Sequence, residues 1–115
     1  MQPRDLVRIR HMLAAACEAR RFAEGRLRGD REQDRMLVLA ITRCIEIIGE
    51  AASRVGPGTQ AEHPGVPWTE AVVMRNRLIH AYFDVDLDRV WDTVSDDLPA
   101  RISELEWILT EVGDT

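Results

Sequence analysis

The stretch that decides the fold is LVLAITRCIEIIGEAASRV, residues 37–55. Its apolar residues recur every three or four positions, and a second apolar stripe runs beside the first. This spacing predicts a helix that is apolar over a wide arc, which is typical of the centre of a bundle or of a contact with a second chain. Gly49 within the helix costs about 1 kcal/mol relative to alanine. We therefore expect another helix to approach closely at Gly49.

The chain before this stretch is predicted to form one more helix. Apolar residues keep the helical period over residues 3–24, and the glycine-containing segment 25–29 interrupts it. Asp30 and Gln33 then resemble a capping box, in which two side chains satisfy the free N–H groups of a first turn. We therefore expect the central helix to begin directly after Asp30.

The chain after this stretch begins with a break and then turns helical again. Gly-Pro-Gly at residues 56–58 ends the central helix, and a loop rich in proline and glycine runs to Val66. Proline suits the first turn of a helix, because the N–H that it lacks has no partner there. The sequence therefore predicts a third helix that begins at Pro67-Trp68 and ends near Phe83.

The last third of the chain reads as one interrupted helix. Asp84 or Asp86 can cap it, and apolar residues continue at helical spacing to Val112. Pro99 is expected to kink or split it, since proline removes a backbone hydrogen bond. The sequence has no strand pattern and no internal repeat. We therefore expect an all-α fold, an antiparallel bundle of four to five helices, in a single domain that spans residues 1–115.

Charge is unevenly distributed along the chain. The net charge is −5 at pH 7, yet residues 1–54 hold eleven arginines against eight acids, and residues 55–115 hold four against twelve. All fifteen basic residues are arginines, whose planar fork can bind phosphate through two hydrogen bonds. This distribution argues against a broad surface that coats nucleic acid, and we expect no DNA binding. Local RNA binding remains compatible with it.

The composition also bounds where the protein works. The N-terminus is polar and has no visible signal peptide. The longest apolar run, residues 36–41, is far shorter than the roughly 20 residues that span a bilayer. Cys17 and Cys44 sit at helical core spacings without a CxxC pattern, so we interpret them as reduced core residues. These observations predict a cytoplasmic protein without a membrane segment.

The motif RNRLIHAY, residues 75–82, carries the chemistry. It places Arg75, Asn76, His80 and Tyr82 along about two turns of one helix. RNA cleavage without a metal needs a base for the ribose 2′-hydroxyl and an acid for the leaving 5′-oxygen. At 100° per residue, Asn76 shares one face of the helix with His80, and Arg75 shares another face with Tyr82. The side chains of Arg75 and His80 therefore converge poorly, unless the Arg75 stem reaches round the helix. Two chains with facing motifs would ease this, which predicts a site at a homodimer interface.

Other interpretations of the same residues stay open. A lone histidine in an apolar helix is commonly structural, Arg75 and Arg77 can pair with the acids after Phe83, and Tyr82 can be a core aromatic. The histidines show no metal-ligand spacing, so no metal or cofactor is expected. A helical assembly protein and a module that binds nucleotide without cleaving RNA are thus alternatives to a ribonuclease.

Four segments of the chain resemble one known family. Arg75-Asn76-x3-His80-x-Tyr82 resembles the R-x4-H-x-Y signature of HEPN-domain ribonuclease toxins, in particular the HepT group. Ile48-Gly49-Glu50-Ala51, the entry His63-Pro64-Gly65-Val66-Pro67-Trp68 and the segment from Val85-Asp86 to Val90-Trp91 resemble that group in the same order. The resemblance covers roughly residues 5–110. Gly65 departs from it, because a charged residue is common at that position.

This resemblance implies a homodimeric, metal-independent endoribonuclease, the toxin of a toxin–antitoxin pair. His80 would act as general base or acid, Arg75 would stabilise the transition state, and Asn76 would orient His80 or the scissile phosphate. The antitoxin would be a nucleotidyltransferase of the MntA type that adds AMP to Tyr82. Glu50 and Arg77 are candidates for lining the cleft, and Glu50 can instead form a salt bridge with an arginine. The alternative is a HEPN module that binds nucleotide and pairs with a nucleotidyltransferase.

Overall fold

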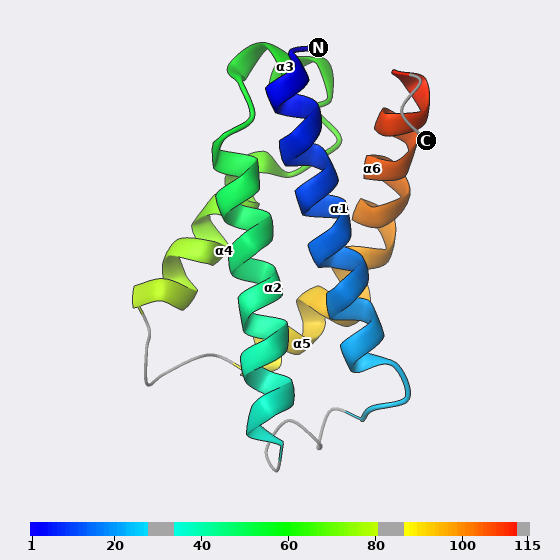
Figure 1. The fold of residues 1–115 in the computed structure, drawn as a ribbon. Coiled ribbons are helices and arrows are strands. Elements are labelled where there is room, and N and C mark those ends of the chain that lie inside the picture. Colours follow the sequence, from blue (N-terminus) through cyan, green and yellow to red (C-terminus); the bar gives the residue numbers. More distant parts are fainter. Residues whose placement is uncertain (28–33, 81–86, 113–115) are drawn as a thin grey trace.

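The protein is built from helices. The computed structural model describes residues 1–27, 34–80 and 87–112, and this part of the chain contains no strand. The long helices are α1 (Pro3–Ala23), α2 (Arg35–Ser53), α4 (Trp68–His80) and α6 (Leu98–Glu111); α3 (Pro57–Glu62), α5 (Leu87–Asp92) and the π-helical turn η2 (Thr93–Asp97) are short (Figure 1). The predicted all-α bundle is confirmed, while the homodimer stays a prediction. None of the described helices is long and apolar enough to cross a membrane.

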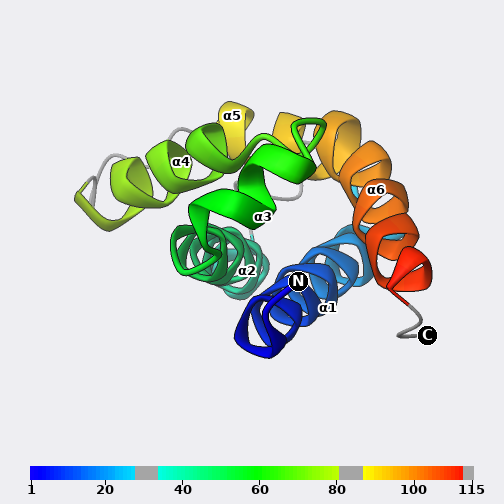
Figure 2. The same cartoon turned by 90° about the horizontal axis from the view of Figure 1, so that it is seen from above.

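The arrangement of the long helices follows from the apolar faces of α1 and α2. These two helices run antiparallel and pack against each other, α4 packs on the other side of α2, and α6 packs on α1. Seen from above, α5 and η2 close the space between α4 and α6 (Figure 2). The apolar core forms two clusters, one around Ile41 and Val94 and one around Ile9 and Ile108, and Ile48 contacts both. The wide apolar arc of α2 thus reflects its central place in the bundle.

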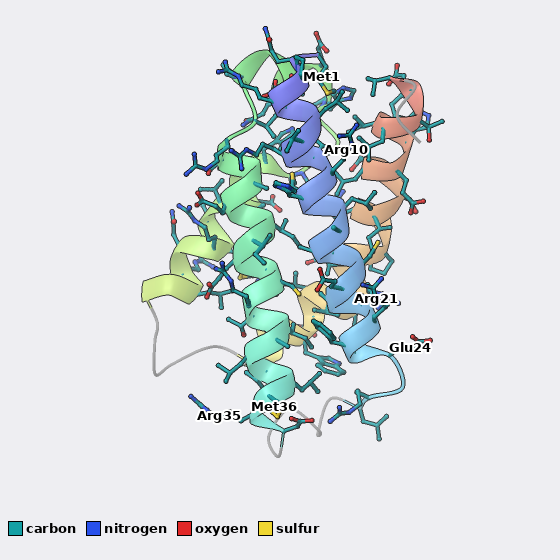
Figure 3. The ribbon with its side chains drawn as sticks, viewed as in Figure 1. Met1, Arg10, Arg21, Glu24, Arg35 and Met36 are labelled. Atoms are coloured by element: carbon teal, nitrogen blue, oxygen red, sulfur yellow. The ribbon has the colours of Figure 1, made fainter. Side chains whose placement is uncertain are left out.

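The start of α2 differs from the expectation. The helix begins at Arg35, and Asp34 is its N-cap, with a carboxylate oxygen that accepts a hydrogen bond from the Leu37 N–H at 3.0 Å. Asp34 also pairs with Arg26 at 2.7 Å. The predicted capping residues Asp30 and Gln33 lie outside the described residues, and the predicted start is several residues too early. Figure 3 shows Arg35 and Met36 at this end of α2, where the Met36 side chain is 82% exposed.

The predicted loop after α2 contains a short helix. α3 begins at Pro57, with Gly56 as its N-cap, and the prediction of an unstructured loop was wrong for its six residues. The cause is a tertiary contact: the carboxylate of Asp5, only 2% exposed, accepts hydrogen bonds from the Gly56 N–H at 3.0 Å and from the Thr59 hydroxyl at 2.7 Å. A helix this short is marginal by itself, so a partner from α1 decides whether it forms.

The interruption predicted at Pro99 takes the form of a π-helical turn directly before it. α5 passes into the π-helical turn Thr93–Asp97, and α6 follows with Pro99 in its first turn. Proline has no N–H to donate to the preceding turn and its ring needs space there, so the backbone widens before it. The expected caps of this segment, Asp84 and Asp86, lie outside the described residues.

Both cysteines carry free thiols, as expected for reduced core residues. Cys44 is 4% exposed within the core cluster around Ile41, and Cys17 is half-buried. Burial raises the pKa of the Cys44 thiol, so this group stays protonated at neutral pH. Cys44 is therefore poorly suited to act as a nucleophile.

Candidate active site

The helix that carries the motif is anchored at its first turn. The Trp68 side chain is 6% exposed, and its indole N–H donates to the His63 carbonyl at 3.0 Å. The Ala71 N–H donates to the Pro67 carbonyl at 3.0 Å, which closes the first turn of α4. Arg101 of α6 donates to the Gly65 carbonyl at 3.2 Å. The segment 63–68 therefore fixes where α4 begins, as its sequence predicted.

Gly49 fixes how closely α4 lies against α2. A Cβ atom built on Gly49 would lie 2.4 Å from the Cβ of Arg75 and 2.6 Å from the Ala71 carbonyl oxygen. Real carbon atoms in contact stay about 3.5–4.0 Å apart, so only glycine permits this packing. The close approach expected at Gly49 is confirmed, and the residue that fills the space is Arg75.

Arg75 is held by two side chains, Glu50 on α2 and Asn76 on its own helix. Its Nη1 donates to Oε2 of Glu50 on α2 in a very short contact. Its Nε and Nη2 both donate to Oδ1 of Asn76, at 3.1 Å and 2.7 Å. The Arg75 side chain is 21% exposed. Its stem lies against Gly49 of α2, and its guanidinium is held between Glu50 and Asn76.

Glu50 is shared between two arginines. Its Oε1 accepts from Nε of Arg54 at 2.8 Å, while Oε2 accepts from Arg75. The Arg54 guanidinium, and then that of Arg75, holds the pKa of Glu50 below its usual range, so the carboxylate is ionised at neutral pH. The alternative that Glu50 forms a salt bridge is confirmed. Arg54 was missed from the sequence, although its i,i+4 spacing from Glu50 was a usable signal.

The structure describes the other predicted site residues to different extents. Asn76 and Arg77 are exposed on α4. His80 is the last residue of α4, and the description covers its place in the helix but not its side chain. Tyr82 lies outside the described residues, as do the acids at 84 and 86 that Arg75 and Arg77 were alternatively expected to meet. The structure therefore brings together Arg75, Asn76 and Glu50, and leaves the roles of His80 and Tyr82 as predictions.

A cavity of about 130 Å³ lies between the helices, but it does not contain this group. Met74 and Ala71 of α4 line it together with Ile45 and Ile48 of α2. Arg75 and Asn76 are not among its lining residues. The charged group lies at the surface instead, with the Arg75 and Glu50 side chains 21% and 46% exposed. Within the described part of the chain, no group of three or more His, Cys, Asp or Glu side chains could hold a metal ion.

Known proteins with similar sequences are named as ribonucleases. A family model described as "Ribonuclease HepT-like" matches residues 12–108. A "Probable ribonuclease HepT" from Thermococcus cleftensis is 41% identical over 73 residues, 64% of this chain and 66% of that protein. A "Putative RNase" from Methanocaldococcus jannaschii is 37% identical over 73 residues, 64% of this chain and 60% of that protein.

One further relative is a longer protein. It is named "Gamma-glutamylcyclotransferase and putative RNase", comes from Methanocaldococcus jannaschii, and is 31% identical over 104 residues, 90% of this chain and 47% of that protein. The chain thus spans between about half and two thirds of the length of these three relatives. No solved structure matches it.

Proposed function

Because this chain belongs to the HepT-like ribonuclease family, we propose that it is an endoribonuclease that cleaves RNA without a metal ion. The observation that carries the proposal is the surface arrangement of Arg75, whose guanidinium is aimed by Glu50 and Asn76. His80 follows five residues later on the same helix, about 7.5 Å further along the axis at 1.5 Å per residue. An RNA strand that crosses this end of α4 would therefore meet a fixed cation and then an imidazole.

The proposed reaction uses these groups in the following way. One His80 imidazole takes the proton of a ribose 2′-hydroxyl, and the 2′-oxygen attacks the neighbouring phosphorus atom. The bond between phosphorus and the 5′-oxygen breaks, and the imidazolium formed in the first step gives its proton to that oxygen. The products are a 2′,3′-cyclic phosphate and a free 5′-hydroxyl. Arg75 stabilises the negative charge that grows on the phosphoryl oxygens, and Asn76 orients Arg75.

We also propose that the site is completed by a second copy of the chain. Met36 and Leu39 on α2 are 82% and 53% exposed, and Val73 on α4 is 41% exposed. At 100° per residue, Met36 and Leu39 fall within about 40° of the position of Glu50, so apolar and charged residues share one face of α2. Position 80 falls within about 20° of Val73 on α4. A partner that covers this surface would bury the apolar residues beside the charged group, which supports a homodimer.

The regulation that we propose follows from the resemblance of the motif. The protein would be the toxin of a toxin–antitoxin pair in the cytoplasm, and a nucleotidyltransferase antitoxin of the MntA type would add AMP to Tyr82. The added phosphates would compete with RNA phosphate for Arg75. Co-expression with the nucleotidyltransferase of a neighbouring gene should add the mass of AMP to the peptide that contains Tyr82. An unmodified peptide would exclude this route.

The activity itself is tested by cleavage of a single-stranded RNA in excess EDTA. We expect the wild-type protein to produce fragments that end in a 2′,3′-cyclic phosphate, and His80→Ala to lower the rate at least 100-fold, the usual scale for a general acid or base. His11→Ala is the matched control, since His11 is exposed on α1 and should leave the rate unchanged. Cleavage that needs added metal, or that survives His80→Ala, contradicts the proposal. So does nucleotide binding without any cleavage, which is the outcome expected of the non-catalytic module.

A mixing experiment tests whether two chains build the site. Arg75→Ala and His80→Ala proteins are each expected to be inactive, but a heterodimer holds one site with both residues if Arg75 of one chain works with His80 of the other. Random mixing makes half of the dimers mixed, so about a quarter of the wild-type rate should return. A mixture that stays inactive would show that the two residues do not complement each other across the interface.

A further inference from the structure

The carboxylate of Glu50 lies where an RNA-binding site should be least tolerant of negative charge. It contacts Nη1 of Arg75, the cation to which we assign the phosphate, and its side chain is 46% exposed. Arg54 and Arg75 lower its pKa, so it carries a full charge at neutral pH. A carboxylate there must repel a polyanion. Glu50 therefore weakens RNA binding, so its contribution to the site must be a different one.

The donor geometry of Arg75 indicates that contribution. A guanidinium has five N–H donors in a rigid fork. Asn76 takes the edge made by Nε and Nη2, and Glu50 takes one N–H of Nη1. Among the described residues, one N–H on Nη1 and one on Nη2 are left without a partner. The one on Nη2 belongs to the end of the fork, the edge that is suited to bind phosphoryl oxygens.

The position of Glu50 lets it hold Arg75 without having to dissociate when substrate binds. Its two oxygens have separate partners, Oε1 with Arg54 and Oε2 with Arg75. It can therefore keep its contact with Arg75 while the end of the guanidinium meets the substrate. Gly49, the residue before it, lets the Arg75 stem lie directly on α2. The stem, the side edge and one Nη are thus all held before substrate arrives.

We propose that Glu50 is a positioning residue of the ribonuclease site, which preorganises Arg75 for the transition state at the cost of weaker RNA binding. This inference rests on the proposed function. Donors that are already aimed need no reorganisation when charge develops, so positioning acts on kcat. The repulsion acts on ground-state binding, so it raises KM. Loss of Glu50 should therefore lower both kcat and KM, a combination that a purely structural role does not produce.

Two substitutions separate the position from the charge. Glu50→Ala removes both, and we expect kcat to fall at least tenfold while KM falls about threefold, the effect that Coulomb's law gives for one unit charge about 6 Å away in water. Glu50→Gln keeps an oxygen that can accept from Arg75, so kcat should stay within about threefold of the wild type. Its KM should fall as in Glu50→Ala, because the charge is gone.

Glu46→Gln is the matched control. Glu46 lies one turn earlier on α2 and pairs with Arg43 rather than with Arg75. The change removes the same charge from the same helix, and both kinetic constants should stay at the wild-type values. A kcat of Glu50→Ala within twofold of the wild type, or a KM that rises, would overturn the inference. An equal fall of KM in Glu46→Gln would reduce the effect to net charge and overturn it as well.

A measurement without cleavage keeps the inference separate from the proposed activity. A 2′-O-methyl RNA oligonucleotide lacks the attacking hydroxyl, and it should bind to Glu50→Ala and Glu50→Gln about threefold more tightly than to the wild type. In NMR spectra, the Nε–H signal of Arg75, assigned by its loss in Arg75→Lys, should broaden in Glu50→Ala but not in Glu46→Gln. Unchanged binding and an unchanged Nε–H signal refute the inference even if the wild type proves not to cleave RNA. Changed signals with no wild-type cleavage would instead refute the proposed function alone.

Discussion

Replacing Gly49 with alanine should push α4 away from α2 and displace Arg75. The new methyl group would lie 2.4 Å from the Arg75 Cβ and 2.6 Å from the Ala71 carbonyl oxygen. Neither atom can rotate away, because one is backbone and the other is attached directly to it. Contact distances between carbon atoms are about 3.5–4.0 Å, so the two helices must separate by about 1 Å.

The size of the effect follows from two opposing contributions. Overpacking of this kind costs typically 1–3 kcal/mol, and the upper end applies where no side chain can yield. Alanine in place of glycine stabilises a helix interior by about 1 kcal/mol. We therefore expect the free energy of unfolding to fall by about 2 kcal/mol. For a domain of this size the melting temperature should drop by about 8 °C.

The assay is urea and thermal unfolding followed by circular dichroism, with Gly58→Ala as the matched control. Gly58 also lies in a helix, α3, but a Cβ there meets nothing within 4 Å. Gly58→Ala should therefore leave the stability unchanged or raise it by up to about 1 kcal/mol. If Gly49→Ala is as stable as the wild type, the close packing of α2 on α4 is not what holds Arg75. We also expect the kcat of Gly49→Ala for RNA cleavage to fall together with its stability, because Arg75 moves with α4.

Two further predictions concern the polar contacts that set the ends of helices. Burial raises the pKa of Asp5, but the hydrogen bonds from Thr59 and the Gly56 N–H outweigh it and leave the pKa lowered; Asp5→Asn should cost about 1–3 kcal/mol at pH 7. The lowered pKa contributes its full stability only above the unfolded value near 3.8, and this contribution is lost as pH falls from there through the folded value. The difference between wild type and Asp5→Asn in urea unfolding should therefore shrink as pH falls below about 4, and a difference that grows there would contradict this account. Asp34→Ala removes the cap of α2, so amide hydrogen exchange at Leu37 should accelerate while exchange in α6 stays unchanged.

Local sequence signals predicted the long helices well, and tertiary contacts explain where they failed. The Trp68 start and the interruption before Pro99 depend on proline geometry and on apolar spacing, which are local properties. α3 depends on Asp5, which lies more than 50 residues away in the chain, so no local sequence pattern predicted this helix. The start of α2 was misplaced because Asp30 and Asp34 are both suitable caps in sequence, and the contact with Arg26 is made by Asp34.

The candidate site divides in the same way. By itself the sequence determined that Arg75, Asn76 and His80 share one helix, that Gly49 marks a close approach, and which family the motif resembles. Only the tertiary structure decided that Arg75 lies on Gly49, that its guanidinium is held by Glu50 and Asn76, and that Arg54 shares Glu50. The physical reason is that helical periodicity specifies the direction of each Cβ, whereas a long arginine side chain chooses among many rotamers. Glu50 on the packed neighbouring helix and Asn76 on the same helix select one of them.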